Sequence, residues 1–331
     1  MQQWNPGQLL QTSGSYWMGC TLHAGVKLDI FSTIAQEQKT ARKISSLIHT
    51  DLDGTSRLLD ALVAMGLLTK HNGDSYANTP ESAMYLQKSS PKYIGYMIMH
   101  HHHLVESWSK LDQAVTTGKP VRDSASHSDG IVRESFLMGM FNNAMIVAPM
   151  VTEAIHIANK HHLLDLGGGP GTYAIHFCQK NPSLKATIYD LTTTKPFAEK
   201  VISQFGMDQR IDFIGGDYVH DNIPGSYDVA WLSHILHGEG PEDCQNIISK
   251  TVSVLNPGGV ILIHDFILKN TKDAPVFPSL FSLNMLVGTE NGRAYAEKEI
   301  GDMLAKAGVE NIRRITINTP NDSGIIIGER P

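Results

Sequence analysis

The chain has few cysteines, and no two of them lie at short spacing. Its 331 residues include three cysteines. Thiols this far apart are interpreted as reduced and buried side chains. The three are Cys20, Cys178 and Cys244.

The chain also lacks a basic excess and the usual marks of export. The formal net charge is -6 and no basic stripe occurs, so no nucleic-acid partner is expected. No charged N-terminal stretch precedes an apolar one, so we expect no signal peptide. No apolar run approaches the roughly 20 residues that span a bilayer, so no membrane partner is expected. Together these absences predict a cytoplasmic location.

The length suggests two domains, or one large domain with an extension. Apolar residues recur at helical spacing over 56–68, and Asn72-Gly73 between two short runs predicts a hairpin. Helices followed by a small hairpin form a winged-helix arrangement, which we expect at 1–95. Arg57 is the only base in the helix before the hairpin, so this domain is predicted to serve dimerisation rather than DNA binding.

Residues 96–160 are predicted to form connecting helices, separated by a loop at 118–130. We expect this segment to line a pocket between the two domains, because methionine adapts to flat ligands. Its pocket candidates are His103, Trp108, Met138 and Phe141.

Four consecutive histidines, 100–103, lie inside this segment. On a helix, His100 and His103 share one face. The run is open to four interpretations: a metal site, one ring in the pocket, a pH sensor, or incidental histidines on a partly exposed helix. No acid or thiol accompanies it at metal-ligand spacing, so no metal is expected.

From residue 161 the pattern changes to strands that alternate with helices. Short apolar strands between helices predict an α/β domain, 161–331, with a parallel doubly wound sheet. The predicted strands are 163–166, 186–189, 211–214, 227–232 and 260–264. A last hairpin, 312–317 and 324–328, would add one antiparallel strand.

A glycine loop follows the first of these strands. Asp165 lies near the end of the strand, and Gly167 and Gly169 let the backbone approach a ligand closely. At the end of the first strand, such a loop lies at the crevice where nucleotide cofactors bind. A dinucleotide fingerprint would have glycine where this chain has Thr172.

Acidic residues end the next two strands. Asp190 is placed to accept hydrogen bonds from ribose hydroxyls. Asp217, after Gly216, is placed to accept from an adenine amine, with Tyr218 packed on the ring. The three strand ends favour S-adenosylmethionine as the cofactor. A nicotinamide cofactor is the alternative, and both Thr172 and the last hairpin count against it.

Two side chains near the ends of the fourth and fifth strands form a candidate acid–base pair. An imidazole with its ordinary pKa of about 6.5 accepts protons near neutrality, and His237 follows the fourth strand. Asp265, after the fifth strand, is placed to hold one ring nitrogen and leave the other facing substrate. The pair predicts proton removal from a hydroxyl acceptor.

These motifs resemble those of the small-molecule O-methyltransferases, the plant phenolic and hydroxyindole enzymes and their bacterial relatives. The likeness covers nearly the whole chain, from Gly66-Leu67-Leu68 through Asn256-Pro257-Gly258-Gly259 to Gly292-Arg293-Ala294-Tyr295. It implies a Rossmann-like class I methyltransferase domain, a homodimer formed through the N-terminal domain, and His237 and Asp265 as base and orienting acid. It also implies cofactor contacts from Gly167, Asp190, Asp217, Tyr218 and Ser233.

The chain departs from the family pattern in places. Gly238-Glu239 follows the base instead of Asp-Trp, Ser233 replaces a plant lysine, and Gly292 stands where plant relatives carry a second acid. The methylated atom is therefore open among oxygen, carbon, nitrogen and sulfur. A non-catalytic, ligand-sensing winged-helix regulator is a further alternative. A flat apolar acceptor is expected, with further pocket walls at Phe281, Asn284 and Met285.

Overall fold

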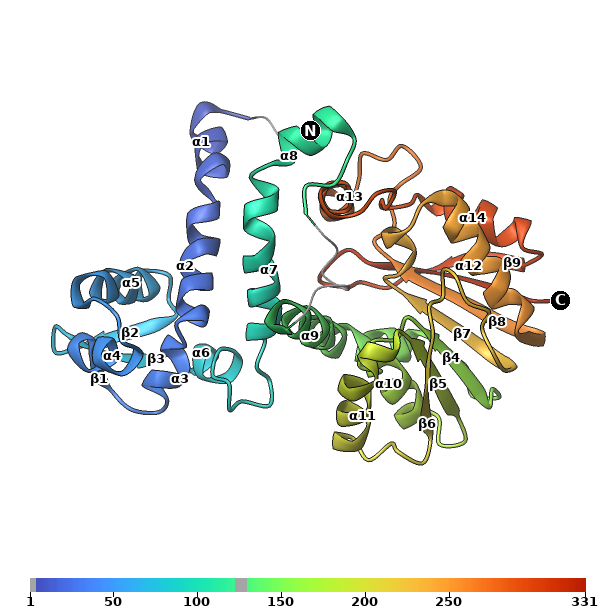
Figure 1. Ribbon diagram of the computed structural model, residues 1–331, viewed down its shortest axis with the longest axis horizontal. Coiled ribbons are helices and arrows are strands. Elements are labelled where there is room, and N and C mark those ends of the chain that lie inside the picture. Colours follow the sequence, from blue (N-terminus) through green and yellow to red (C-terminus); the bar gives the residue numbers. More distant parts are fainter. Residues whose placement is uncertain (1–3, 123–129) are drawn as a thin grey trace. The chain divides into compact units, whose positions relative to one another are not determined.

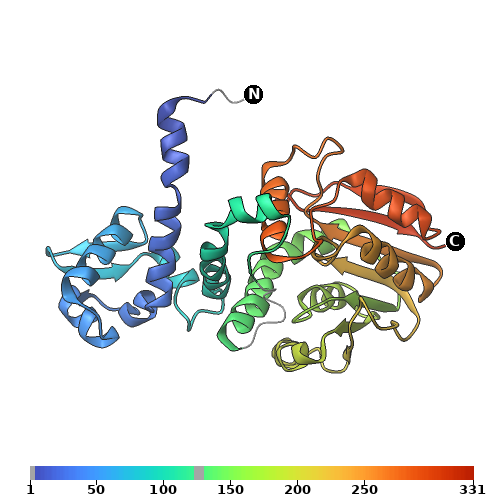
Figure 2. The ribbon, with the colours of Figure 1, turned by 45° about the horizontal axis from the view of Figure 1, so that its top comes forward.

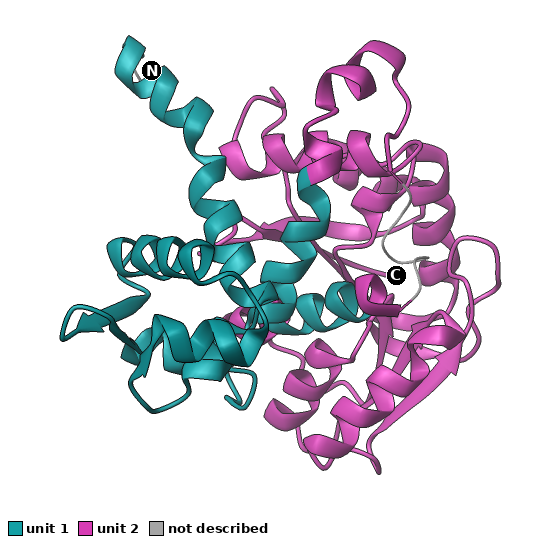
Figure 3. Ribbon diagram, turned by 60° about the vertical axis from the view of Figure 1, so that its left-hand side comes forward, with its two compact units in different colours: residues 1–105, 134–142 teal, residues 106–133, 143–331 magenta. Residues whose placement is uncertain are grey.

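The chain separates into two compact units. Unit 1 comprises residues 1–105 and 134–142, and unit 2 comprises residues 106–133 and 143–331 (Figure 3). The computed structural model describes residues 4–122 and 130–331. Most of the predicted loop 118–130 therefore lies outside the described residues. The predicted division at 95 and 160 stays a prediction.

Unit 1 is mainly helical and contains a small antiparallel sheet of order β1-β3-β2 (Figure 1). The hairpin β2–β3 confirms the predicted one, with Asn72 and Gly73 at positive φ in its turn. The elements are α1 (Pro6–Gly14), α2 (Tyr16–Lys27), α3 (Ile30–Ile34), β1 (Lys39–Thr40), α4 (Ala41–Ile48), α5 (Leu52–Ala64), β2 (Leu68–His71), β3 (Ser75–Asn78), α6 (Pro80–Tyr85) and α7 (Gly95–Trp108).

Side-chain caps and one apolar cluster define these helices. Thr40, Asp51 and Thr79 each accept a hydrogen bond from a backbone N–H in the first turn of the helix they precede. The helices bury a common core whose central members are Phe31, Ile34, Ile44, Leu59 and Leu62. The Leu residues of the 56–68 pattern thus face this core.

Unit 2 is built on a seven-stranded sheet of order β6-β5-β4-β7-β8-β10-β9. β10 runs antiparallel to β8 and β9, and the pairs among the other strands are parallel. The predicted mostly parallel sheet with a final antiparallel strand is confirmed. The strands are β4 (His162–Leu166), β5 (Lys185–Asp190), β6 (Ile211–Gly215), β7 (Tyr227–Ser233), β8 (Leu255–Asp265), β9 (Glu310–Ile315) and β10 (Gly324–Glu329).

Helices cover both faces of this sheet (Figure 2). On one face, α12 and α14 bury Ile247 and Ile300 with Ala230 and Ile263 of the strands. On the other, Phe177 of α10 packs edge-on against Trp231. The elements are α8 (Leu111–Thr117), α9 (Gly130–Ala154), α10 (Thr172–Lys180), η2 (Thr192–Thr194), α11 (Lys195–Gln204), η3 (Leu236–Gly238), α12 (Pro241–Ser253), α13 (Val276–Gly288) and α14 (Glu297–Lys306).

Two further features concern β8 and α9. The motif Asn256-Pro257-Gly258-Gly259 lies within β8, where the pairing with β7 shifts register and Gly258 has a positive φ of 72°. No uninterrupted apolar run of about 20 residues was expected, and α9 is a candidate span by its length and mean composition. This 25-residue helix is the one among the described residues long and apolar enough to cross a bilayer. Core helices pass the same test, and 44% of its most apolar window is buried.

Candidate active site

The sequence-predicted residues meet at the carboxyl ends of the parallel strands in unit 2. β4 ends at Leu166, just after Asp165, and β5 ends at Asp190. β7 and β8 end at Ser233 and Asp265. Ligands of open α/β sheets bind at this edge.

The glycine loop after β4 has no room for a side chain at its first two glycines, Gly167 and Gly168. Gly167 has a φ of 64°, and a methyl group there would lie 2.5 Å from Cγ2 of Ile235 and 3.3 Å from the ring of Tyr218. A methyl group at Gly168 would lie 2.6 Å from the carboxyl carbon of Asp165. This part of the loop therefore packs tightly against Asp165 of its own strand and against Tyr218 and Ile235 of the neighbouring loops.

Asp165 is buried beneath this loop. Its Oδ2 accepts a hydrogen bond from Ala174 N at 3.2 Å. Its Oδ1 has no hydrogen-bond partner within residues 4–122 and 130–331. Burial raises the pKa of this carboxyl to about 7. A buried acid of this kind is available to a ligand that donates a hydrogen bond or carries positive charge.

Asp190 joins β5 to the glycine loop. Its Oδ2 accepts from Gly169 N at 2.8 Å, and its Oδ1 accepts from Leu191 N at 2.7 Å and Thr194 Oγ1 at 3.0 Å. Burial nevertheless raises the pKa of Asp190. The carboxylate is thus fixed in orientation at the edge of the loop.

Asp217 organises the turn that follows β6. Its Oδ1 accepts from Val219 N at 2.8 Å, and its own N–H donates to Asp221 Oδ2 at 2.9 Å. Gly216 N donates to the carbonyl of Asp190 at 2.9 Å, which ties this turn to the end of β5. Tyr218 contacts the glycine loop, and burial raises the pKa of its hydroxyl.

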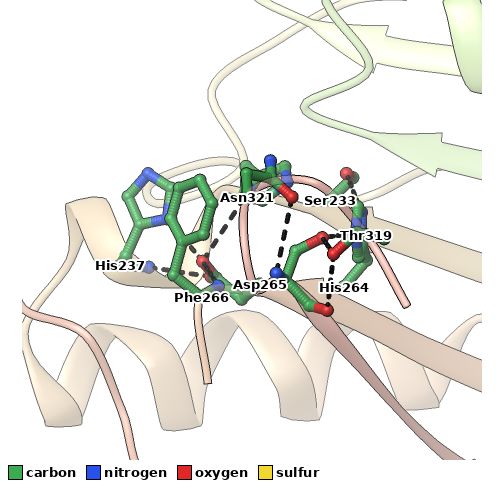
Figure 4. A network of polar contacts seen from close by, with 9 residues as sticks. Ser233, His237, His264, Asp265, Phe266, Thr319 and Asn321 are labelled. Atoms are coloured by element: carbon green, nitrogen blue, oxygen red, sulfur yellow. Dashed lines mark hydrogen bonds and ion pairs between the residues drawn. The ribbon is translucent and has the colours of Figure 1, made fainter. Parts of the chain in front are cut away.

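His237 and Asp265 form a close pair. Nδ1 of His237 lies 2.6 Å from Asp265 Oδ1, and the backbone N–H of His237 lies 3.3 Å from Oδ2 (Figure 4). Burial disfavours the Asp265 anion, yet the neighbouring His237 and His234 hold its pKa well below the usual range. A carboxylate only accepts, so Nδ1 is the donor and the lone pair resides on Nε2.

His234 lies beside this pair in a left-handed backbone conformation, with a φ of 57°. Its Nδ1 is 3.6 Å from the same Asp265 Oδ1. The three side chains are the one group of His, Cys, Asp and Glu within metal-ligand reach in the described part of the chain. The run 100–103 is not part of it. The expectation of no metal stays a prediction.

An aromatic wall flanks the pair. The ring of Phe281 lies edge-on to His237 at 4.7 Å between centroids, and Phe266 lies 4.4 Å from Phe281. Phe277 packs against Phe266 at 5.0 Å. These rings give one side of the base an apolar, flat surface.

Behind the pair, Ser233 belongs to an inner network rather than to an open surface. Ser323 Oγ donates to Thr319 Oγ1 at 3.0 Å and accepts from His264 Nε2 at 2.9 Å. His264 Nδ1 therefore accepts from Ser233 Oγ at 2.9 Å (Figure 4). Burial keeps the pKa of His264 far below its ordinary value, so the ring is neutral. The predicted cofactor contact of Ser233 stays a prediction.

The predicted pocket residues divide between the two units. In unit 2, Trp108 Nε1 donates to Asn284 Oδ1 at 3.0 Å, and Met285 is buried beside Asn284 on α13. His103 lies on α7 and belongs to unit 1. Met138 and Phe141 lie on the part of α9 that belongs to unit 1. A pocket that joins these three to His237 stays a prediction.

No acid occupies the place of the second acid of plant relatives. A methyl group at Gly292 would lie 2.5 Å from the carbonyl oxygen of His237 and 2.8 Å from that of Gly238. The chain thus has no room for a side chain there, because the loop packs directly on the backbone of the base.

Sequence reasoning missed three residues at this edge. Phe266 directly follows Asp265, and its aromatic character was a usable signal. Thr194 and Arg133 reach Asp190 through hydroxyl contacts. Arg133 lies 57 residues before Asp190 in the chain, and no local pattern connects the two.

Comparison with known proteins agrees with this geometry. A family model for the O-methyltransferase domain matches residues 108–310, and one for the O-methyltransferase dimerisation domain matches residues 10–88. A 3-hydroxy-5-methyl-1-naphthoate 3-O-methyltransferase of Streptomyces sahachiroi is 30% identical over 98% of this chain and 95% of the relative.

Two solved structures extend the comparison. An O-methyltransferase family protein from Burkholderia thailandensis has a TM-score of 0.88 and 26% identity, with 99% of each chain covered. Human N-acetylserotonin methyltransferase, solved in complex with SAM, has a TM-score of 0.87 at 22% identity, over 100% of this chain and 99% of that one, and shares the fold. The chain belongs to the O-methyltransferase family and is an S-adenosylmethionine-dependent methyltransferase.

Proposed function

We propose that this enzyme methylates a hydroxyl oxygen of a small, flat aromatic acceptor, with His237 as general base. The observation that carries the proposal is the 2.6 Å contact from His237 Nδ1 to the buried Asp265. It fixes the tautomer in which Nε2 is free to accept a proton. Methylation of carbon, nitrogen or sulfur is less directly served by the His237–Asp265 pair, because no hydroxyl proton has to be removed from those acceptors.

The residues at the glycine loop fit S-adenosylmethionine. A methyl group at Gly169 would meet no heavy atom of the described chain within 4 Å, so the loop has an open side. Oδ1 of Asp165, which has no hydrogen-bond partner in the described part of the chain, suits a cofactor that carries both an ammonium and a sulfonium charge. We assign the ribose hydroxyls to Asp190 and the adenine to Asp217 and Tyr218. The backbone at Gly167, Gly169 and Gly216 permits the close approach.

His237 and Asp265 then perform the proton chemistry. Nε2 of His237 takes the hydroxyl proton, and Asp265 stabilises the imidazolium that forms. Figure 4 shows the second ring nitrogen of His237 turned away from Asp265. When bound, S-adenosylmethionine supplies the methyl group on a sulfonium that leaves as a neutral thioether. The protein contributes alignment of the acceptor and proton removal, the latter typically worth about 10²–10⁴-fold.

The aromatic wall supports an aromatic acceptor. Phe281 offers partly exposed flat apolar surface next to the base, with the buried Phe266 packed behind it, and stacked or edge-on rings gain about 0.5–1.5 kcal/mol beyond their buried area. The Streptomyces relative acts on a hydroxylated naphthoate, which has this shape and this functional group. We infer that Trp108, Asn284 and Met285 form a further part of the acceptor site, and that His103, Met138 and Phe141 complete it.

We also propose that the enzyme is a cytoplasmic homodimer. Its three cysteines are free, which fits a reducing compartment. Apolar side chains along α1 and α2 are exposed in the single chain, which fits coverage by a second copy. These side chains are Leu9, Leu10, Tyr16, Trp17 and Met18.

The nature of the acceptor is tested by product analysis. The enzyme is incubated with methyl-labelled S-adenosylmethionine and separate panels of phenols, hydroxynaphthoates, aromatic amines and thiols, and the products are analysed by mass spectrometry. We expect label on oxygen of the hydroxylated aromatics only. Transfer to amines or thiols without transfer to hydroxyls would overturn the proposed acceptor. Binding of S-adenosylhomocysteine without any transfer across the panels would favour the ligand-sensing alternative.

A further inference from the structure

Arg133 lies at the start of α9 and contacts the turn η2. Its Nη2 is 2.5 Å from Thr193 Oγ1 and 3.4 Å from Thr194 Oγ1. The residue is half-buried. Its planar guanidinium donates in a fixed fork, so it can serve two neighbouring hydroxyls at once. The contact joins the start of α9 to the segment that follows β5.

The same turn, η2, also hydrogen-bonds to Asp190 at the end of β5. Thr194 Oγ1 donates to Asp190 Oδ1 at 3.0 Å. A hydroxyl has one proton, so Thr194 must accept the hydrogen bond that it shares with Arg133. The result is a directed chain from the guanidinium through the hydroxyl to the carboxylate. Such chains polarise each hydrogen bond along their length.

The charge of Arg133 also acts on Asp190. Burial raises the pKa of this carboxyl, while hydrogen bonds from Gly169 N, Thr194 and Leu191 N and the positive charge of Arg133 oppose the rise. With less such support, the pKa of a buried carboxyl is higher, and the group loses acceptor capacity earlier on acidification.

We propose that Arg133 is a positioning residue for the methyl donor, which fixes the hydroxyls of Thr193 and Thr194 so that Asp190 is held ionised and oriented toward the ribose. This inference rests on the proposed cofactor site. Arg133 acts through Thr194 and does not itself touch the donor. Thr193 anchors the guanidinium, and Thr194 transmits its orientation to the carboxylate.

The effect is expected in donor affinity and in its pH dependence. Loss of Arg133 leaves Asp190 buried with less support for its charge, so the carboxyl protonates at a higher pH. Binding of S-adenosylhomocysteine should therefore weaken. On acidification it should begin to fall at a higher pH than in the wild type, beyond the change that neighbouring Asp165, with a pKa of about 7, contributes in both proteins. A purely structural role of Arg133 would change thermal stability without moving this pH dependence.

The test is calorimetric titration of the full-length protein with S-adenosylhomocysteine from pH 6 to pH 8.5. We expect Arg133→Met to weaken binding about tenfold at neutral pH, as loss of hydrogen-bond support to a charged group predicts. Arg133→Lys should recover part of this affinity. Lys195→Met is the matched control, because it removes a positive charge from the residue next to Thr194. The ammonium of Lys195 lies 3.6 Å from a carboxylate oxygen of Glu199. The affinity of Lys195→Met for S-adenosylhomocysteine should equal that of the wild type.

Two more variants separate this inference from the cofactor assignment. Thr194→Val should weaken binding by a similar factor, and the double variant with Arg133→Met should lose little more, because both break the same chain. Asp190→Ala should weaken binding further. If Asp190→Ala binds normally, the proposed cofactor site fails. If Asp190→Ala is impaired while Arg133→Met and Thr194→Val bind like the wild type with an unchanged pH dependence, only the role of Arg133 is overturned.

Discussion

Single carboxylates carry much of the candidate site, and each is held by hydrogen bonds from its own loop or from a neighbouring segment. Asp190 and Asp217 are fixed mainly by backbone N–H groups. Asp265 is fixed by His237 and by Phe266 N at 2.8 Å. Asp165 differs, because one of its oxygens has no partner among the described residues. Asp165 and Asp265 therefore respond differently to pH, because the pKa of Asp165 is raised and that of Asp265 is lowered.

Asp165 should lower stability of the ligand-free protein as pH rises. Its pKa is raised to about 7 in the folded state, so the folded protein holds a proton that the unfolded chain releases near pH 4. Stability is then lost from about pH 4 to pH 7, by an amount on the order of a few kcal/mol. Asp165→Asn has no such charge and should be free of this loss.

The measurement is the melting temperature of both proteins across pH 4.5–8 by scanning calorimetry. Asp165→Asn should gain stability over the wild type as pH rises. A constant difference between the two across this range would contradict the raised pKa of Asp165.

At the scale of elements, strand ends were predictable and the loops packed on them were not. Alternating apolar strands and helices locate Asp190, Asp217 and Asp265, because side chains that follow parallel strands meet at one edge. The departure at Gly292 was visible in the sequence. The reason for glycine at this position was not visible in the sequence. The carbonyl oxygens that exclude a side chain there belong to residues 237 and 238, more than 50 residues earlier. Long-range backbone packing leaves no periodic signal.

Gly292→Ala tests this packing. The added methyl group would lie 2.5 Å from the carbonyl oxygen of His237, so the backbone of the base must shift. A displacement of the order of 1 Å in a catalytic group can cost about 10²-fold in rate, so we expect kcat to fall by about 10–100-fold.

Gly301→Ala is the control, because the nearest atom to its added methyl group lies 3.9 Å away. Rates with one acceptor and circular dichroism spectra of both variants provide the readout. Full activity of Gly292→Ala would show that the loop yields without moving His237.

At the scale of the whole molecule, the sheet followed from the order of strands and helices and the family from the resemblance of motifs, while contacts between distant segments of the site did not. The mostly parallel sheet and the N-terminal hairpin were both predicted from local patterns. The contact of Arg133 with Thr193 and that of Trp108 with Asn284 join segments 60 and 176 residues apart. Sequence periodicity describes each segment by itself and gives no pairing between them.

Dimerisation should depend on the exposed apolar face of α1 and α2. Leu10 and Trp17 are 74% and 68% exposed in the single chain. An aspartate at either position would bury a charge in the proposed interface, which costs far more than the apolar contact gains. We expect Leu10→Asp and Trp17→Asp to be monomeric by light scattering after size exclusion.

Val115→Asp is the control, because Val115 is similarly exposed on α8 in unit 2. It should leave the dimer intact. A dimer that persists in both Leu10→Asp and Trp17→Asp would place the interface elsewhere.

The central claim is that the pair of His237 and Asp265 removes the acceptor's proton during methyl transfer. The most direct test is the single-turnover rate of methyl transfer to one identified hydroxylated acceptor by the wild type and by His237→Asn, with S-adenosylhomocysteine affinity measured in parallel. The account predicts a rate about 10²–10⁴-fold lower in the variant, with unchanged affinity. Transfer to oxygen at the wild-type rate by His237→Asn would contradict it.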